Sequence, residues 1–298
     1  MSQSVRLGFF CALGAYTIWG LLPLYFKALG HIQPELMLAH RIVWSLPTGL
    51  VLLAIAGALP ELKAALNRKI ALGLTLSALL IALNWLVYIW AVGQDRVLEA
   101  SLGYYINPLV NVAIGALFLA ERLRLMQWSA VGLATIGVIV MAYALGEVPV
   151  VALVLCFSFA GYALIRKYLV IDGRAGFVLE TAILFPLALI WLFHFSEQGG
   201  AVWGHGTPRD IGLLLLAGPL TAFPLILFAL AAKRLTFATV GMMQYIGPTL
   251  QFLLATLFFG EVFGPVHGLA FGFIWAALFV FSFDSLKISR SNRVASPD

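Results

Sequence analysis

Ten runs of about 20 predominantly apolar residues divide this sequence, and they restrict its possible folds more than any other feature. A helix rises about 1.5 Å per residue, so roughly 20 apolar residues span the ~30 Å hydrocarbon core of a bilayer. Only 10% of the 298 residues are charged, whereas a soluble domain carries about 25%. The sequence therefore predicts an all-α membrane protein with ten transmembrane helices at residues 7–28, 36–57, 69–92, 98–119, 126–145, 149–167, 176–195, 210–232, 237–259 and 265–284.

Lysine and arginine are distributed unevenly between the two sides that these spans define. Of the 18, fourteen lie on the side of the N-terminus, three lie on the other side, and Arg41 lies within the second span. Cytoplasmic loops carry the excess of basic residues, so both termini are predicted to be cytoplasmic. The fourteen are spread over six segments without forming one patch, which argues against a nucleic-acid partner. They are Arg6, Lys63, Arg68, Lys69, Arg122, Arg124, Arg166, Lys167, Arg174, Lys233, Arg234, Lys287, Arg290 and Arg293.

The second half of the chain repeats the first at an offset of 140 residues. The segment "YYINPLVNVAIGALFLAE" (104–121) aligns with "QYIGPTLQFLLATLFFGE" (244–261), which pairs Pro108 with Pro248 and Glu121 with Glu261. Five helices is an odd number, so the second half must enter the membrane from the opposite face. The predicted organisation is two inverted five-helix repeats, 7–145 and 147–285, followed by a cytoplasmic tail, 286–298. Inverted repeats of this kind are typical of solute transporters.

The duplicated pattern, with Pro followed thirteen residues later by Glu, resembles the EamA-type drug/metabolite transporter superfamily. Seven segments resemble its RarD-like subgroup, described as chloramphenicol-sensitivity proteins: "YTIWGLLPLYFK", "HRIVWSLP", "NWLVYIWAV", "LEASLGYYINPLVN", "ERLRLMQW", "FSFAGYALIRK" and "QYIGPTL". The resemblance covers about residues 7–285. It implies export of small solutes across the bacterial inner membrane and leaves the solute open.

The two prolines predict where a solute would bind. Pro108 and Pro248 lie near the middle of their spans, and each removes a backbone donor and frees the carbonyl four residues earlier. Irregular backbone at membrane depth is tolerated only against protein or a water-filled cavity. We therefore expect both helices to kink around a central cavity between the halves. The candidate solute-binding residues are Trp19, Asn84, Tyr88, Tyr105, Asn107, Gln244 and Tyr245. The alternative for all of them is ordinary helix packing.

Ionisable groups within the spans form a second set of candidates. His40, Arg41 and Glu180 lie about one turn inside the membrane, where charged groups are expensive and commonly functional. They are candidates for proton coupling or gating, although each could equally hold a helix end. Glu121 and Glu261 end the proline-containing spans, and we expect them to accept hydrogen bonds from neighbouring loop N–H groups.

Other functional classes fit the sequence less well. An intramembrane enzyme would need paired carboxylates, a nucleophile with its base, or a metal-binding motif, and the five histidines are scattered. An ion channel would need a filter or a ring of charges. A carrier of a lipid or lipid-linked sugar remains an alternative on the same fold. The sequence indicates no catalytic residues, no metal site and no cofactor, and it leaves open the direction of transport, the coupling ion and the oligomeric state.

Overall fold

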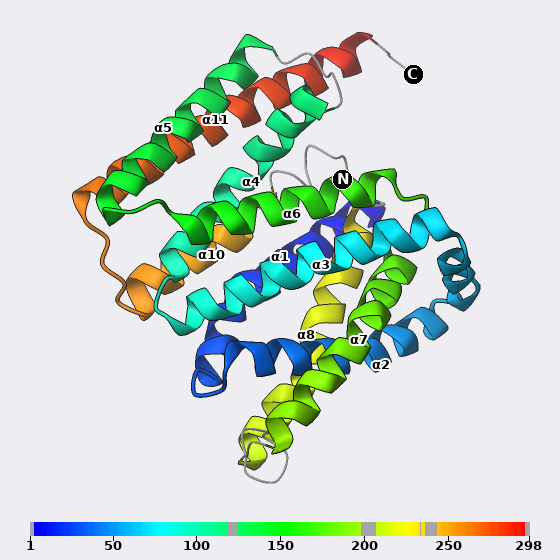
Figure 1. Ribbon diagram of the computed structural model, residues 1–298. Coiled ribbons are helices and arrows are strands. Elements are labelled where there is room, and N and C mark those ends of the chain that lie inside the picture. Colours follow the sequence, from blue (N-terminus) through cyan, green and yellow to red (C-terminus); the bar gives the residue numbers. More distant parts are fainter. Residues whose placement is uncertain (1–2, 119–123, 198–206, 233, 236–242, 296–298) are drawn as a thin grey trace.

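Long apolar helices follow one another along the chain, as the spans predict. The computed structural model describes residues 3–118, 124–197, 207–232, 234–235 and 243–295, which form ten α-helices and two short elements of other helical type (Figure 1). The α-helices are α1 (Gln3–Ala28), α2 (Pro34–Ile55), α3 (Arg68–Gly93), α4 (Val97–Phe118), α5 (Leu125–Leu145), α6 (Val150–Tyr168), α7 (Gly173–Glu197), α8 (Pro208–Ala232), α10 (Ile246–Leu253) and α11 (Pro265–Ala295). The 3-10 helix η1 covers Leu59–Leu66, and the π-helix η2 covers Leu254–Phe258.

Most helices match the predicted spans to within a few residues, and the last two, α10 and α11, differ from them clearly. α4 continues without interruption through Pro108. Pro248 lies in the first turn of α10, directly after a turn at Gln244 and Tyr245, so the predicted ninth span is interrupted before its proline. A proline in the first turn loses no helical hydrogen bond. α11 extends to Ala295, so most of the predicted tail continues the last helix.

Apolar side chains cover the outside of the molecule as well as its interior. On α3, Leu72, Leu76 and Leu79 are exposed along one stripe, whereas Leu74 and Ala78 on the opposite side are fully buried. Seven helices in the described part of the chain are long and apolar enough to cross a bilayer. An exterior stripe of leucine is costly in water and favourable against lipid tails. The chain is therefore a multi-pass membrane protein.

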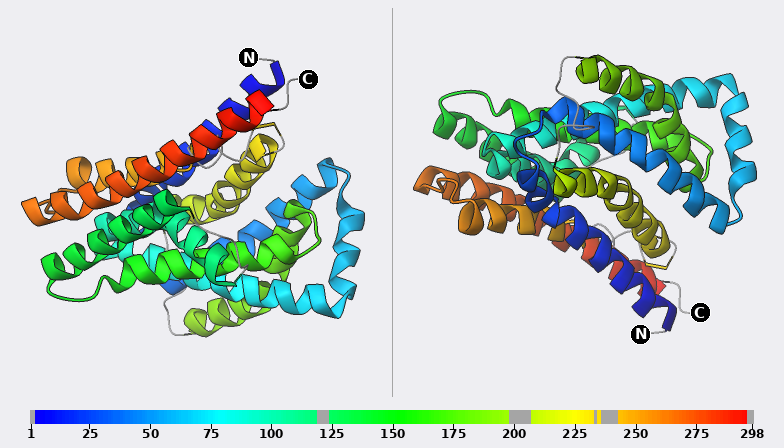
Figure 2. Two further views of the ribbon diagram at one scale, coloured as in Figure 1. Left: turned by 90° about the horizontal axis from the view of Figure 1, so that it is seen from above. Right: turned by 90° about the horizontal axis from the view of Figure 1, so that it is seen from below.

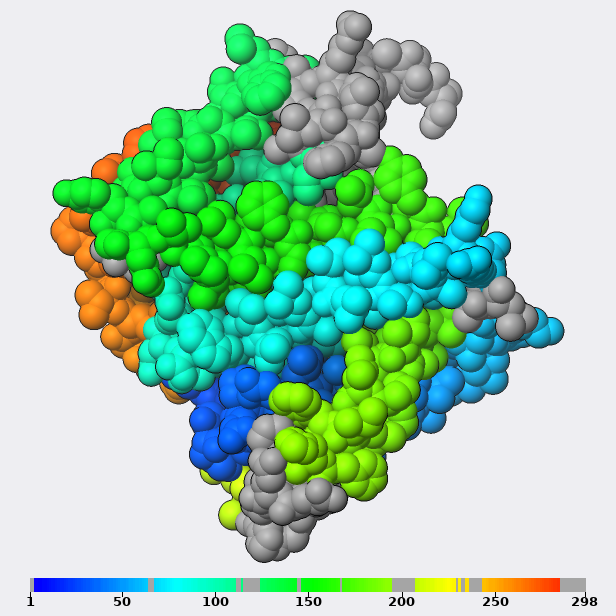
Figure 3. Space-filling view, viewed as in Figure 1, coloured from blue at the N-terminus to red at the C-terminus, as the bar shows by residue number. Residues whose placement is uncertain are grey.

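Helices of the two sequence halves interdigitate. α2 packs on α7 and α8, α3 on α6, α1 on α8, and α4 on α6 and α10, while α5 pairs with α11 (Figures 1 and 2). At the offset of 140 residues, α1–α8 and α6–α3 are equivalent contacts, as are α4–α6 and α10–α1. In the space-filling view, α3 and α6 form adjoining bands across one face (Figure 3). The buried core thus takes side chains from helices of both sequence halves.

Acidic side chains connect the two halves at the beginning of α4. Glu261, in the loop before α11, accepts hydrogen bonds from the backbone N–H groups of Val97 (2.7 Å) and Leu98 (2.8 Å). Burial raises the pKa of the Glu261 carboxyl, and these two donors act in the opposite direction. Glu99 in turn accepts from the N–H of Val151 at the start of α6 (3.1 Å). The expected structural role of Glu261 is confirmed, but its donors belong to the first turn of α4 and not to a loop. A carboxylate there satisfies unpaired donors at a helix N-terminus. Glu121, its counterpart, lies outside the described residues.

Candidate solute-binding cavity

A cavity of about 300 Å³ lies at the centre of the helix bundle, and eight described helices line it. Both halves contribute, through α1 to α4 on one side and α6, α7, α8 and α10 on the other. Its wall is largely aromatic, with a few amide, hydroxyl and charged side chains between the rings. The aromatic members are Tyr16, Trp19, Trp85, Tyr88, Tyr104, Phe159, Tyr162, Phe177 and Phe228. Pockets that bind organic ligands commonly combine an apolar wall with a small number of placed polar groups.

Most of the site residues predicted from the sequence line this central cavity. Of the solute-binding and kink candidates, those that line the cavity are Trp19, Asn84, Tyr88, Asn107, Gln244 and Pro248. Of the charged candidates, Arg41 and Glu180 line it. The remaining four lie elsewhere: Tyr105, Pro108, Tyr245 and His40.

Tyr105 and Tyr245 pack against each other, away from the cavity. Their rings are stacked, with centroids 6.4 Å apart, and the Tyr105 hydroxyl hydrogen-bonds the hydroxyl of Thr249 (2.8 Å). Successive residues on a helix point about 100° apart. The neighbouring Tyr104 therefore faces the cavity in place of Tyr105. His40 is fully buried but does not line the cavity.

The amides around the cavity are used in different ways. The Asn84 amide donates to the carbonyl of Leu155 (2.9 Å) and the hydroxyl of Ser158 (3.0 Å), and its oxygen accepts from the Tyr104 hydroxyl (3.1 Å). By contrast, neither amide atom of the fully buried Asn107 has a hydrogen-bond partner in the described part of the chain. The same holds there for the hydroxyl of Tyr88. Buried polar groups are normally paired, so these two are suited to meet a ligand or water in the cavity.

Arg41 supplies a cation to one side of the cavity. The residue is 6% exposed. Its guanidinium lies over the ring of Trp85, 4.1 Å from the ring centroid, and 5.8 Å from the centroid of Phe26. Its Nε donates to the hydroxyl of Thr221 (2.9 Å), which itself donates to the carbonyl of Ala217 (2.8 Å). In the described residues, no carboxylate forms an ion pair with Arg41. Contacts with ring faces offset part of the desolvation of a guanidinium.

Glu180 supplies a carboxylate that is already paired. It is 3% exposed, and its Oε1 lies 3.6 Å from Nη1 of Arg166 and accepts from the Ser77 hydroxyl at 2.6 Å. Glu180 on α7 is therefore balanced by Arg166 on α6, whereas Arg41 on α2 has no carboxylate partner among the described residues.

Sequence reasoning missed several wall residues that helix periodicity indicates. Tyr16 lies three residues before Trp19, and Tyr104 lies three residues before Asn107. Residues three or four apart share a helix face, so each predicted residue indicated that the residue one turn earlier also lines the cavity. Thr221 carried no comparable signal, because its role depends on Arg41 of a different helix.

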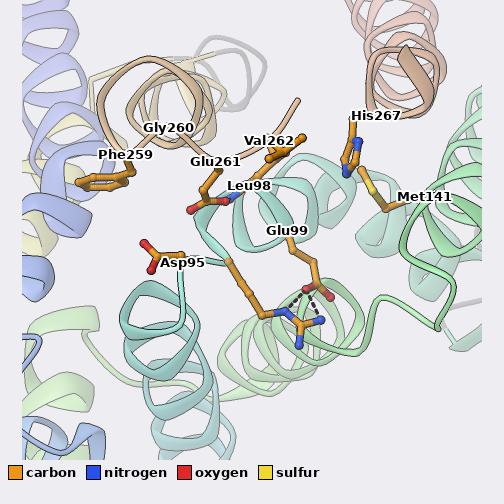
Figure 4. Close-up of a pocket in the computed structure, with 10 residues that line it drawn as sticks. Asp95, Leu98, Glu99, Met141, Phe259, Gly260, Glu261, Val262 and His267 are labelled. Carbon is orange, nitrogen blue, oxygen red and sulfur yellow. Dashed lines mark hydrogen bonds and ion pairs between the residues drawn. The ribbon is translucent and has the colours of Figure 1, made fainter. Parts of the chain in front are cut away.

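A second cavity, of about 460 Å³, lies at the beginning of α4, between that helix and the loop before α11 (Figure 4). Its acidic groups have structural partners: Glu261 binds the first turn of α4, and Glu99 pairs with Arg96 (2.7 Å). No group of three or more His, Cys, Asp or Glu side chains among the described residues could hold a metal ion. The central cavity is therefore the stronger candidate for solute binding.

Comparison with known proteins agrees with this architecture. Residues 6–143 match the model of the EamA-like transporter family. The chain is 44% identical to Protein RarD of Escherichia coli (strain K12) over 97% of its own length and 98% of that protein. It is 42% identical to the uncharacterized transporter YojE of Bacillus subtilis (94% of each chain) and 32% identical to the chloramphenicol-sensitive protein RarD of Pseudomonas aeruginosa (95% and 96%). A solved crystal structure superposes with a TM-score of 0.61 at 19% identity, covering 92% of this chain and 96% of the other, which confirms the fold class.

Proposed function

The chain belongs to the EamA-like transporter family, with RarD proteins among its relatives, and from this premise we propose that it exports small organic, amphipathic or aromatic solutes across the bacterial inner membrane by alternating access. It is a membrane transporter and not an enzyme. The observation that carries the finer proposal is the central cavity, which both halves line and which holds polar groups that have no hydrogen-bond partner among the described residues. Transporters built from inverted repeats bind their substrates at such an interface.

The orientation and the repeat boundaries belong to the same proposal. We propose that both termini face the cytoplasm and that the repeats cover residues 7–145 and 147–285. The excess of lysine and arginine on the N-terminal side supports the orientation. The start of α1 and the end of α11 also lie at the same end of the molecule (Figure 2). The equivalent contacts α1–α8 and α6–α3 support the boundaries.

A ligand screen tests the proposed function. Purified protein is screened by thermal shift against amino acids, chloramphenicol and other amphipathic metabolites, and hits are assayed for transport in proteoliposomes. A ligand present at 100 times its Kd adds about 2.7 kcal/mol to the stability of the folded state. We expect at least one hit that is also transported. A folded protein that responds only to lipids, and whose lipid binding is not competed by small polar solutes, would favour the lipid-carrier alternative.

Glu180→Gln is expected to uncouple transport from a proton gradient. Protonation of Glu180 would release Arg166, so this pair between α7 and α6 is a suitable coupling device. In proteoliposomes, the variant should retain downhill exchange of a transported solute but lose accumulation driven by a pH gradient. The control is Glu61→Gln, which changes an exposed carboxylate in η1. Accumulation by the Glu180→Gln variant at the wild-type level would exclude Glu180 as the coupling group.

A further inference from the structure

We propose that Arg41 binds the carboxylate of a small organic acid in the central cavity, and that the substrates of this protein are therefore monocarboxylates with an aromatic or similarly flat apolar body. This inference rests on the proposed function, since it names the substrate class of the same cavity. Its starting point is a buried cation that lines a cavity and has no carboxylate partner in the described part of the chain. A charge removed from water and left unbalanced is strongly unfavourable, and an arriving anion would balance it.

The contacts of Arg41 leave its ligand-binding groups available. Trp85 covers one face of the guanidinium, and Thr221 occupies only Nε. Both terminal nitrogens keep donors in the plane of the group, and no described protein atom accepts from them. The Thr221 hydroxyl holds the guanidinium in place, since it accepts from Arg41 and donates to the carbonyl of Ala217. A planar guanidinium with two parallel donors matches the geometry of a carboxylate.

The charge of the cavity favours one carboxylate over a phosphate. Arg41 is the unbalanced cation among the described lining residues, and the acid that shares the cavity, Glu180, is already paired with Arg166. A singly charged ligand would thus balance Arg41, whereas a dianion would bring a second charge without a partner. The aromatic rings that line the cavity favour an apolar, flat ligand body. Beside it, Tyr88 and Asn107 offer polar atoms that have no partner in the described part of the chain.

Matched pairs of ligands test this assignment on the purified wild-type protein. Titration calorimetry compares benzoate with benzamide, phenylacetate with phenylacetamide, 3-phenylpropionate with its amide, and indole-3-acetate with indole-3-acetamide. Each pair has nearly the same shape and differs in charge. At least one carboxylate should bind about tenfold or more tightly than its amide, the factor expected for a hydrogen-bonded charge. Inorganic phosphate should not compete with it.

Variants then assign the preference to Arg41. Arg41→Gln should remove the discrimination between acid and amide, and Arg41→Lys should retain part of it. The control is Lys69→Gln, which changes an exposed cation at the start of α3 and should leave the discrimination intact. The wild-type comparison stands even if Arg41→Gln does not fold. Equal binding of acids and amides, no binding of any acid, or unchanged discrimination in a folded Arg41→Gln variant would overturn the assignment. Any of these results would leave the transporter proposal intact if the broader screen finds an uncharged solute that is transported.

Discussion

Gly103→Leu is expected to prevent the protein from folding stably, and this is the largest effect on stability that we predict. Gly103 lies where α4 meets α6, and a Cβ atom at this position would lie 2.6 Å from the carbonyl oxygen of Ala152 and 3.0 Å from its Cα. Backbone atoms of a packed helix cannot move aside as a flexible side chain can. The two helices would have to separate, and overpacking of this kind costs about 3 kcal/mol or more. Small residues at such contacts allow close approach of membrane helices.

The measurement is the midpoint of unfolding in detergent, with Gly103→Ala as a milder variant. Gly103→Ala should lower the midpoint, at a cost of about 1–2 kcal/mol. Gly132→Ala is the matched control, because it lies within α5 and a Cβ there would meet no atom within 4 Å. That substitution should leave the midpoint unchanged or raise it, since alanine is favoured over glycine within a helix. An unchanged midpoint for Gly103→Ala would contradict the close packing of α4 against α6.

Asn107→Ala and Asn84→Ala are expected to have opposite effects on binding and stability. The Asn107 amide has no partner in the described part of the protein, so its removal should weaken binding of a transported solute and leave the unfolding midpoint almost unchanged. The Asn84 amide joins α3 to α6 and to Tyr104, so its removal should lower the stability by about 1–2 kcal/mol. The two substitutions thus distinguish an amide expected to bind the ligand, Asn107, from an amide that joins helices, Asn84.

The double variant Asn107→Ala/Gln244→Ala extends this comparison across both halves. Asn107 lies on α4 and Gln244 in the turn before α10, and both line the cavity. Loss of two ligand hydrogen bonds should reduce transport by about tenfold to a hundredfold. The assay is the initial rate of transport in proteoliposomes at equal amounts of inserted protein. Unaltered transport by the folded double variant would show that the solute binds elsewhere.

The sequence by itself determined the helices, the fold class and much of the cavity wall. Apolar runs of bilayer length identify spans because backbone groups in lipid must be satisfied within the helix. The offset of 140 residues identified Pro108 and Pro248 as equivalents and pointed to their polar neighbours Asn107 and Gln244, both of which line the cavity. Arg41 and Glu180 were recognisable because charges are rare and costly at membrane depth.

Only the tertiary structure decided which way each helix is turned. Tyr104 faces the cavity and Tyr105 does not, although the two are adjacent in the sequence. In a soluble protein, polar residues mark the face of a helix that contacts water. In this protein, the lipid and the core are both apolar, so the sequence does not show which face of a helix is buried. Helix geometry gives only the angle between successive side chains. The partners of Asn84 and Arg41 come from other helices, at sequence distances of 71 and 180 residues for Leu155 and Thr221. Such contacts depend on how the helices of the two halves pack together. Packing therefore decided that the Asn84 amide joins helices and that Arg41 has no carboxylate partner among the described residues.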